Sequence, residues 1–403
     1  MPALFFVFIL SLWASFHVWV ARRQIARGRD YSPAVQRAIW GGVLAIFMLP
    51  MISFVGRRAG LPGTDNNTLQ WIGFICMGLS TLLVAFTIAV DTPAALARTS
   101  LAIRRWWHQR RSPTNEAPPD PELISPERRR FFADVANYGI VGGAAGLSVA
   151  GFAAASRVPQ VVETEVPVPG LHPDLDGLRI AQLSDVHVGP TIRGTWLDKV
   201  VEVVNGLEPD LVALTGDFID GFVDEIGWEL EGLSRLRSRH GSFFVTGNHE
   251  YYWDGPAWCE AVAALGPTVL HNEHRVIEHG GARLLVAGVP DIGATRHEPT
   301  HASDPAKAKA DAPEHDYSLL LAHQPKSIYA AAKAGFDLQL SGHTHAGQYF
   351  PGSLLIHLAQ PYVKGLARHE DTHIYVSAGT GYWGPPNRAG SPSEISLLTL
   401  RRA

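Results

Sequence analysis

The stretch "SGHTHAGQ", Ser341 to Gln348, places two histidines one residue apart, directly after the alternating apolar run "DLQL". Side chains i and i+2 of a strand point to the same face. His343 and His345 therefore converge on one point if the extended backbone continues to the end of the strand. Two neighbouring imidazoles suggest a metal site, but a solvated pair in a surface loop explains them equally well until further ligands are found.

Around this stretch, short apolar runs alternate with helical patterns. The apolar runs predict strands at "LRIAQLS" (178–184), "LVALT" (211–215), "SFFVT" (242–246), "SLLLA" (318–322) and "LQL" (338–340). Helical periodicity predicts helices at residues 196–207, 256–266 and 325–335, the last two opening with Pro and closing with Gly. Alternation of strands and helices predicts an α/β domain.

Each predicted strand is followed at once by side chains that can bind a metal. In α/β folds, ligands gather beyond the carboxyl ends of the strands, so five such endings indicate one site. Imidazoles mixed with carboxylates suit Mn, Fe or Zn better than Ca. The candidates are Asp185, His187, Asp217, Asn248, His323, His343 and His345.

In this order, the motifs resemble the calcineurin-like metallophosphoesterases. The family pattern D-x-H, G-D, G-N-H-[DE], a single His and G-H-x-H is complete over residues 178–400, as Asp185–His187, Gly216–Asp217, Gly247–Glu250, His323 and Gly342–His345. The sequences "AQLSDVHVG" and "SGHTHAGQ" most resemble those of the bacterial branch of the family that is membrane-associated or exported by the twin-arginine route. Ala346 stands where that branch more often has Gly.

The resemblance implies a four-layer α/β/β/α sandwich with two divalent metal ions, Mn, Fe or Zn, at the strand ends. It assigns one metal to Asp185, His187 and His345, the other to Asn248, His323 and His343, and makes Asp217 the bridge. Gly216 would then allow a close backbone approach. The implied reaction is attack on phosphorus by a hydroxide shared between the metals. His249 would neutralise the charge that develops in the transition state or protonate the leaving oxygen. Glu250 would orient the His249 imidazole.

Other side chains are weaker candidates. Arg193 and Arg388 are the cations placed to reach a phosphate oxygen. The candidates for a substrate rim are the aromatic residues Tyr251, Tyr252, Trp253, Tyr382 and Trp383. The alternatives are that they dip into the membrane interface or pack in the core. The histidines His297, His301 and His315 lie in a polar Ala/Pro/Asp segment and are expected to be solvated.

The first 156 residues have a different composition and predict a membrane region. Residues 3–21, 39–56 and 72–90 are uncharged and apolar, each close to the ~20 residues that cross a bilayer as a helix. Buried helices of a soluble core are the alternative. A fourth uncharged stretch, 135–155, is rich in Gly and Ala, which suits close helix packing in lipid.

The fourth stretch follows "SPERRRFF", which resembles a twin-arginine export signal, although an ordinary basic anchor explains it equally well. Arginines gather between spans one and two, from Arg22 to Arg37, and between spans three and four, from Arg98 to Arg130. The positive-inside rule makes these loops cytoplasmic. With four spans, residues 157–403 lie outside the cytoplasm, at a bacterial inner membrane; if the fourth stretch does not cross, the orientation reverses.

These observations predict a membrane region (1–156) and a phosphoesterase domain (157–403). The second region carries 30 acidic against 19 basic side chains, which argues against nucleic acid as a partner. The two cysteines fall in different regions, so a disulfide is not expected. We expect a membrane-anchored enzyme that hydrolyses a phosphodiester or pyrophosphate, with a lipid headgroup as the favoured substrate. The alternative is a catalytically retired fold that binds or regulates.

Overall fold

A computed structural model describes residues 2–26, 31–59, 67–111 and 125–403. The chain divides into two compact units, Met1–Val149 and Ala150–Ala403. The predicted boundary after residue 156 falls just beyond the last helix of the membrane region, which ends at Ala155. That helix runs across the boundary between the two units. The functional extent of each domain stays a prediction.

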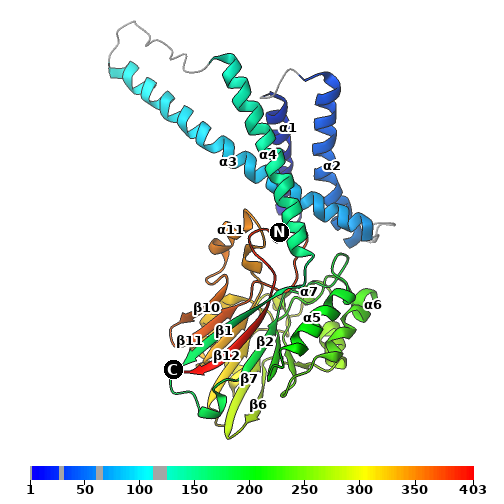
Figure 1. Cartoon of the computed structure of the whole chain (residues 1–403), viewed down its shortest axis with the longest axis vertical. Coiled ribbons are helices and arrows are strands. Elements are labelled where there is room, and N and C mark those ends of the chain that lie inside the picture. The colour runs from blue at the N-terminus through cyan, green and yellow to red at the C-terminus, as the bar shows by residue number, and fades with distance from the viewer. Residues whose placement is uncertain (1, 27–30, 60–66, 112–124) are drawn as a thin grey trace. The chain divides into compact units, whose positions relative to one another are not determined.

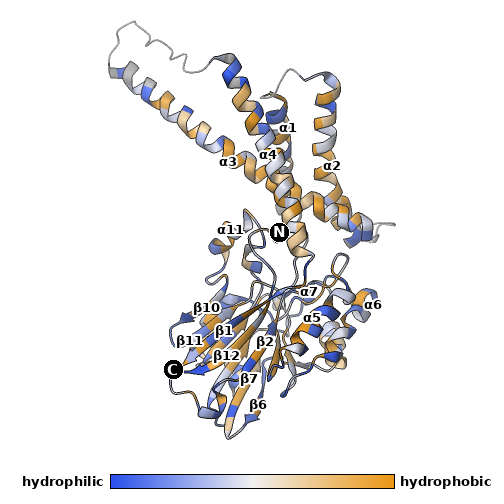
Figure 2. Cartoon of the chain, viewed as in Figure 1, coloured by the Kyte–Doolittle hydropathy of each residue, from blue (hydrophilic) through white to orange (hydrophobic). Residues whose placement is uncertain are grey.

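The first unit is built from long helices: α1 (Pro2–Ala26), α2 (Pro33–Arg58), α3 (Asn67–Arg111) and α4 (Pro126–Ala155). Within the described residues, three segments are long and apolar enough to cross a membrane: Pro33–Arg57, Asn67–Arg104 and Arg130–Ala155. These contain the predicted spans 39–56, 72–90 and 135–155, and Figure 2 shows the apolar residues along them. The predicted span 3–21 lies in α1, which is helical but is not among the three.

The arginines predicted to occupy loops lie mostly on helices. Helix α3 continues past its apolar part to Arg111, so the residues from Arg98 onward extend that helix. Arg27 and Arg29 lie outside the described residues. Arg23 lies just beyond the predicted span 3–21, and Asp91 just beyond the predicted span 72–90. The Nε atom of Arg23 donates to Asp91 Oδ1 at 3.1 Å, and this buried ion pair links α1 to α3.

The second unit contains two six-stranded sheets (Figure 1). The first has the order β1 (Gln160–Val168), β12 (Glu394–Arg402), β2 (Arg179–Leu183), β3 (Leu211–Leu214), β4 (Ser242–Phe244) and β5 (Thr268–Val269). The second has the order β10 (Gly365–His369), β11 (Thr372–Val376), β9 (Leu338–Ser341), β8 (Tyr317–Leu321), β7 (Ala282–Gly288) and β6 (Glu273–His279).

Helices cover the outer faces of both sheets. One core joins the sheets face to face, with Ile180 and Leu211 from the first and Leu284, Leu319 and Leu340 from the second. Outside the first sheet pack α5 (Gly194–Gly206) and α8 (Gly255–Ala264). Outside the second pack α9 (Pro305–Lys309) and α10 (Ile328–Lys333). The predicted α/β/β/α layering is confirmed.

All five predicted strands form, as β2, β3, β4, β8 and β9. Strands β3 and β8 are buried along their whole length, because both faces of each sheet are covered. Strands β2 to β4 are mutually parallel, as are β7 to β9, so within each sheet their carboxyl ends meet at one edge. Residues 325–335 form a short 3-10 turn followed by α10, where one continuous helix was predicted.

Shorter helices complete the second unit: α6 (Val223–Ile226), α7 (Asn248–Tyr252) and α11 (Gly352–Ala359). The 3-10 segments are η1 (Pro173–Leu175), η2 (Gly227–Arg235), η3 (Ala294–Arg296), η4 (Pro325–Ser327) and η5 (His345–Gly347).

Candidate metal centre

The carboxyl ends of β2, β3, β4, β8 and β9 bring the predicted ligands together. Their side chains form two neighbouring clusters, in each of which three ligand atoms lie within 4.8 Å of one another. The first cluster holds Asp185, His187 and His345, and the second holds Asp217, His323 and His343. The first cluster has the members of one implied ligand set, and the second brings His323 and His343 of the other set together with Asp217, the implied bridge.

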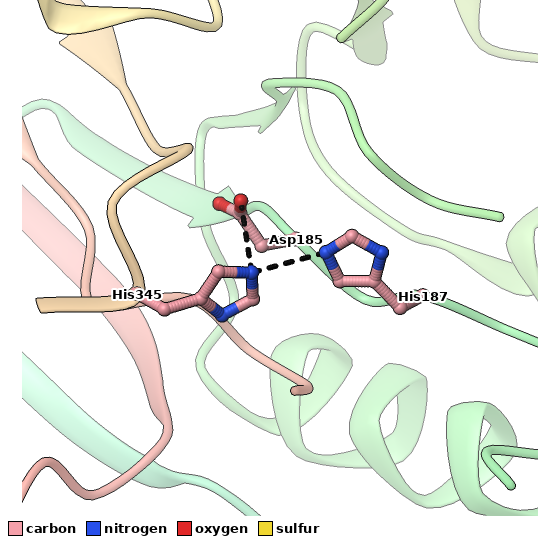
Figure 3. A group of neighbouring side chains, drawn as sticks. All are labelled: Asp185, His187 and His345. Atoms are coloured by element: carbon pink, nitrogen blue, oxygen red, sulfur yellow. Dashed lines mark hydrogen bonds and ion pairs between the residues drawn. The ribbon is translucent and has the colours of Figure 1, made fainter. Parts of the chain in front are cut away.

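The first cluster draws on both sheets, with Asp185 and His187 following β2 and His345 following β9 (Figure 3). The two Nε2 atoms of His187 and His345 lie 3.0 Å apart, and His345 Nε2 lies 3.4 Å from Asp185 Oδ1. Figure 3 shows the carboxylate and both rings directed toward one point. Two nitrogens and one oxygen therefore converge at a spacing that one divalent ion can fill.

The second cluster is equally compact. His323 Nε2 lies 3.0 Å from Asp217 Oδ2 and 3.2 Å from His343 Nδ1. The other nitrogen of His323, Nδ1, lies 2.8 Å from the carbonyl oxygen of Thr215. Donation to that carbonyl fixes the tautomer and leaves Nε2 free to bind a metal, a common arrangement for metal-binding histidines.

Asp217 connects the two clusters. Besides its contacts with His323 and His343, it forms a third candidate group with His187 and His249. Asn248, the remaining predicted ligand, begins α7 beside this carboxylate, and its buried Oδ1 atom has no hydrogen-bond partner in the described part of the chain. An orphaned amide oxygen next to imidazoles and carboxylates fits a cation, because a buried acceptor is otherwise costly.

The backbone at the site is strained. Five of the predicted ligands have positive φ angles: Asp185 (56°), His187 (56°), Asp217 (56°), His343 (70°) and His345 (48°). Left-handed conformations in non-glycine residues cost roughly 1–3 kcal/mol each and cluster at functional sites. The expectation that an extended backbone aims His343 and His345 at one point is wrong, since β9 ends at Ser341 and the turn sends each imidazole to a different cluster.

Two glycines allow the loops after β3 and β4 to meet. Gly216 has φ +84°, and a Cβ atom there would collide with the backbone of Gly247. A Cβ on Gly247 would in turn collide with Asp217. The predicted close backbone approach next to Asp217 is confirmed.

Burial and neighbouring charges fix the protonation of the clusters. Burial, with a smaller effect of His323, lowers the pKa of His343 to about 3. Burial, reinforced by Arg388, lowers the pKa of His345 well below its ordinary value. Both rings are therefore neutral at physiological pH, as metal binding requires. Burial alone would raise the pKa of Asp217, but the His323 and His249 imidazoles outweigh it and keep the pKa well below its ordinary value.

His249 is held by a carboxylate that the sequence analysis did not identify, Asp220. His249 Nδ1 lies 2.6 Å from Asp220 Oδ1, and His187 Nδ1 lies 3.3 Å from Asp220 Oδ2. Burial alone would lower the pKa of His249, but Asp217 and Asp220 raise it to about 9. The available signal was the second acid in "GDFID", three residues after the predicted bridge.

Glu250 does not orient the His249 imidazole, so that expectation is wrong. Its carboxylate accepts hydrogen bonds from the backbone N–H groups of Asp217 (3.0 Å), Phe218 (2.7 Å) and Gly247 (2.6 Å). The buried Glu250 side chain thereby fixes the loop that carries Asp217. Burial, together with the nearby Asp217 carboxylate, raises the pKa of Glu250 to about 7.

Arg388 cannot reach a phosphate, contrary to expectation. Its guanidinium is 1% exposed and donates to the carbonyl oxygens of His345, Ala378, Gly379 and Gly381 and to the hydroxyl of Ser393. All three guanidinium nitrogens thus donate to groups in the loops behind His345. The other predicted cation, Arg193, pairs with Glu229 and lies over the Trp228 ring.

The predicted aromatic residues divide between rim and core. Tyr252 and Trp383 are partly exposed and pack against the His249 ring at centroid distances of 5.0 Å and 5.6 Å. Trp253 packs on Phe222 at 5.1 Å. The side chains of Tyr251 and Tyr382 are buried.

The three histidines expected to be solvated differ among themselves. His301 Nδ1 lies 2.8 Å from the Tyr251 hydroxyl, so the expectation is wrong for this residue. His297 is exposed and contacts the Tyr252 ring, and His315 is half-buried.

A further acid beside the centre, Asp291, was also missed. It follows β7, is buried, and accepts from Gln324 Nε2 at 2.9 Å, next to His323. Burial raises its pKa. The signal was again a polar residue after an apolar strand, in "LLVAGVPD", a sixth strand ending. A separate group, Asp210, His240 and His279, lies at the opposite ends of these strands, with His240 Nε2 and His279 Nδ1 2.9 Å apart.

Comparison with known proteins identifies the family. Residues 178–347 match the family model described as calcineurin-like phosphoesterase. A zebrafish transmembrane protein with metallophosphoesterase domain is 33% identical over 410 residues, covering 99% of this chain and 89% of the relative. This chain belongs to the calcineurin-like metallophosphoesterases.

Relatives of this metallophosphoesterase occur in vertebrates and bacteria. The cattle transmembrane protein with metallophosphoesterase domain is 34% identical over 413 residues, covering 99% of this chain and 88% of the relative. A Helicobacter pylori metallophosphoesterase is 42% identical over 244 residues, covering 60% of this chain and 64% of the relative. Among solved structures, the NAD nucleotidase of Haemophilus influenzae is 14% identical, covering 51% of this chain and 50% of that chain, with a TM-score of 0.37.

Proposed function

We propose that this chain is a membrane-anchored, dinuclear-metal phosphoester hydrolase in which Asp217 is shared by both metal ions. The observation that carries this proposal is the position of Asp217, which belongs to candidate ligand groups with His187 on one side and with His323 and His343 on the other. Asp185, His187 and His345 would hold one divalent ion, and Asn248, His323 and His343 the second. The mixed nitrogen and oxygen donors favour Mn, Fe or Zn.

The chain's own residues supply the proton chemistry. Two bound ions at this site would polarise the phosphoryl oxygens and lower the pKa of a water molecule to near neutrality. His249, fixed by Asp220, would then carry the proton that the leaving oxygen needs, since its raised pKa keeps it protonated at neutral pH. Its position at the start of α7, between Tyr252 and Trp383, supports a place beside the substrate.

The charge of the site supports a phosphodiester or pyrophosphate as substrate. Arg388 is committed to backbone carbonyls, Arg193 is paired with Glu229, and Asp220 and Asp291 add negative charge. A phosphate monoester dianion usually needs additional cations. A diester carries one negative charge per phosphate and suffers less repulsion. Membrane anchoring favours a lipid headgroup as the source of this phosphate.

The proposed location is the bacterial inner membrane, with several spans and the catalytic unit outside the cytoplasm. Three membrane-capable helices and the transmembrane relatives support anchoring. The arginines on the predicted cytoplasmic side support the orientation. The bacterial relatives and the "SPERRRFF" lead support membership of the bacterial branch linked to twin-arginine export.

The substrate proposal is tested with the full-length protein in detergent. Bis(p-nitrophenyl) phosphate and p-nitrophenyl phosphate are compared at equal concentrations of Mn²⁺, with Asp217→Ala as the control for contaminating activity. We expect the larger kcat/KM for the diester. A tenfold advantage for the monoester, ~1.4 kcal/mol in transition-state free energy, would overturn the substrate claim.

The alternative function is that of a catalytically retired fold that binds or regulates. Loss of a ligand would mark such a protein, whereas here all seven predicted ligand positions and His249 carry competent side chains. Metal-loaded protein that hydrolyses neither model ester nor a lipid-linked pyrophosphate would favour this alternative.

A further inference from the structure

Helix α11 (Gly352–Ala359, "GSLLIHLA") is apolar yet contributes no buried residue to the second unit. Its three leucines are strongly exposed: Leu354 at 65%, Leu355 at 56% and Leu358 at 86%. Leu354 and Leu358 are four residues apart and Leu355 and Leu358 three apart, so the three share one side of the helix. Clustered exposed apolar side chains mark a surface that binds a membrane, another protein or a ligand.

The segment that contains α11 has the composition of a membrane-interface segment. No Asp, Glu, Lys or Arg occurs between Asp337 and Lys364. The aromatic residues Tyr349, Phe350 and Tyr362 flank the helix, and aromatic side chains are enriched where protein meets the headgroup region. The rim of a protein–protein interface is usually polar and charged, and this segment has no Asp, Glu, Lys or Arg.

Helix α11 is attached directly to the metal centre. Gly347, which ends η5, approaches Gly352 so closely that a Cβ atom on Gly347 would collide with the Gly352 carbonyl oxygen. On the other side of α11, Thr344 Oγ1 donates to the carbonyl oxygen of Val363 at 2.7 Å. The helix therefore projects from the turn that carries His345.

The same turn is joined to the end of α4, the last membrane-capable helix. Within the second unit, the backbone N–H of Arg388 donates to the Gly151 carbonyl oxygen at 3.0 Å, and Arg388 Nη1 donates to the His345 carbonyl oxygen at 2.9 Å. A Cβ atom on Gly151 would collide with Asn387, so this contact is close. Arg388 thus contacts both Gly151, near the end of α4, and His345, in the turn that precedes α11.

We propose that α11 docks into the surface of the bilayer that α4 crosses, with Leu354, Leu355 and Leu358 among the acyl chains just below the headgroups. Lipid fits as the partner of a helix that has no Asp, Glu, Lys or Arg, is flanked by aromatic residues and follows the turn that Arg388 links to Gly151 of α4. The inference rests on the proposed membrane location and deepens the proposed function. Docking holds the metal centre and its rim, Tyr252 and Trp383, at headgroup level. The substrate class is therefore a phosphoester whose apolar part remains in the bilayer.

Depth measurements on the full-length protein in lipid nanodiscs test this proposal. Cys76 and Cys259 are replaced by Ala, and single cysteines are introduced by Leu358→Cys and Leu354→Cys for labelling with the environment-sensitive fluorophore NBD. The matched control is Glu278→Cys, an exposed position near the end of β6, at the strand edge opposite the metal centre. Quenching is measured with nitroxide-labelled phosphatidylcholine and with aqueous iodide.

We expect strong quenching by the lipid nitroxide and little by iodide at 358 and 354, and the reverse at 278. Iodide quenching at 358 and 354 equal to that at 278 would overturn the proposal. Protection from both quenchers would also overturn it, because another protein surface would then cover α11. The readout needs no hydrolysis, so a lipid-embedded α11 in an inactive protein would refute the proposed function alone.

Discussion

Asp220 is shared by two histidines of different predicted roles: its Oδ1 atom lies 2.6 Å from Nδ1 of His249, and its Oδ2 atom lies 3.3 Å from Nδ1 of His187. One buried carboxylate therefore orients both a candidate metal ligand and the residue proposed to carry the leaving-group proton. Each imidazole keeps its Nε2 atom directed toward the centre, where a metal or a substrate oxygen would lie. The short His249 contact is a charge-assisted hydrogen bond, stronger than a neutral one.

This pair predicts a pH dependence in the metal-free protein. The pKa of His249 is raised to about 9, above its ordinary value, so the stability contributed by the protonated ring is complete below about pH 6.5 and is lost as pH rises through about 9. Asp220→Asn removes one of the charges that raise the pKa and should shift the loss to lower pH. Thermal unfolding measured from pH 6 to 10 checks this. His249→Ala should lack the part of the transition that His249 contributes and keep that of His323, whose pKa Asp217 raises against the effect of burial. An unchanged profile in Asp220→Asn would contradict the pairing.

Glu250→Ala should destabilise the protein and disorder the metal centre. The substitution leaves the backbone N–H groups of Asp217, Phe218 and Gly247 without their acceptor, and an unsatisfied buried donor costs about 1–3 kcal/mol. We expect a lower melting temperature together with reduced metal content. Glu250→Gln, which keeps one acceptor oxygen, should be intermediate. A variant with normal stability and metal content but no turnover would instead place Glu250 in the chemistry.

The catalytic unit should lie outside the cytoplasm. A reporter that is active only after export, fused after Ala403, should be active, and a reporter that is active only in the cytoplasm should be silent there. Fusions placed after Ala59, which follows α2, provide an internal comparison, because with four spans this point of the chain is also exported. Cytoplasmic activity at Ala403 would contradict the four-span topology.

The strands and a single site at their ends could be predicted because strand periodicity and strand-end residues are local signals, whereas the division of the ligands into two clusters followed only from the family resemblance. Five apolar runs each end in a potential ligand, and parallel strands necessarily bring those ends to one edge. Asp220 and Asp291 were missed because the local signal, an acid shortly after an apolar strand, does not identify the distant partner of each, His249 for Asp220 and Gln324 for Asp291. The expected roles of Glu250, orienting His249, and of Arg388, reaching a phosphate, were wrong for a related reason. Both side chains form hydrogen bonds with backbone groups of loops that meet only in the folded chain.

His343 and His345 show where the period-two alternation of side chains along a strand stops being a guide. Period-two alternation holds only while the backbone is extended, and His343 and His345 have φ angles of 70° and 48°. The backbone after β9 adopts left-handed angles because His343 and His345 belong to different clusters, whose other members follow other strands. The sequence after β9 alone therefore does not reveal this strain.

The metal content of Asp217→Ala tests the central claim most directly. Wild-type protein loaded with Mn²⁺ should retain two ions per chain by elemental analysis. Asp217→Ala, which removes the carboxylate common to both clusters, should retain at most one and lose activity. The matched variant His249→Ala should keep both ions while losing roughly two to four decades of rate. Two tightly bound ions in Asp217→Ala would contradict the shared-ligand centre on which the account depends.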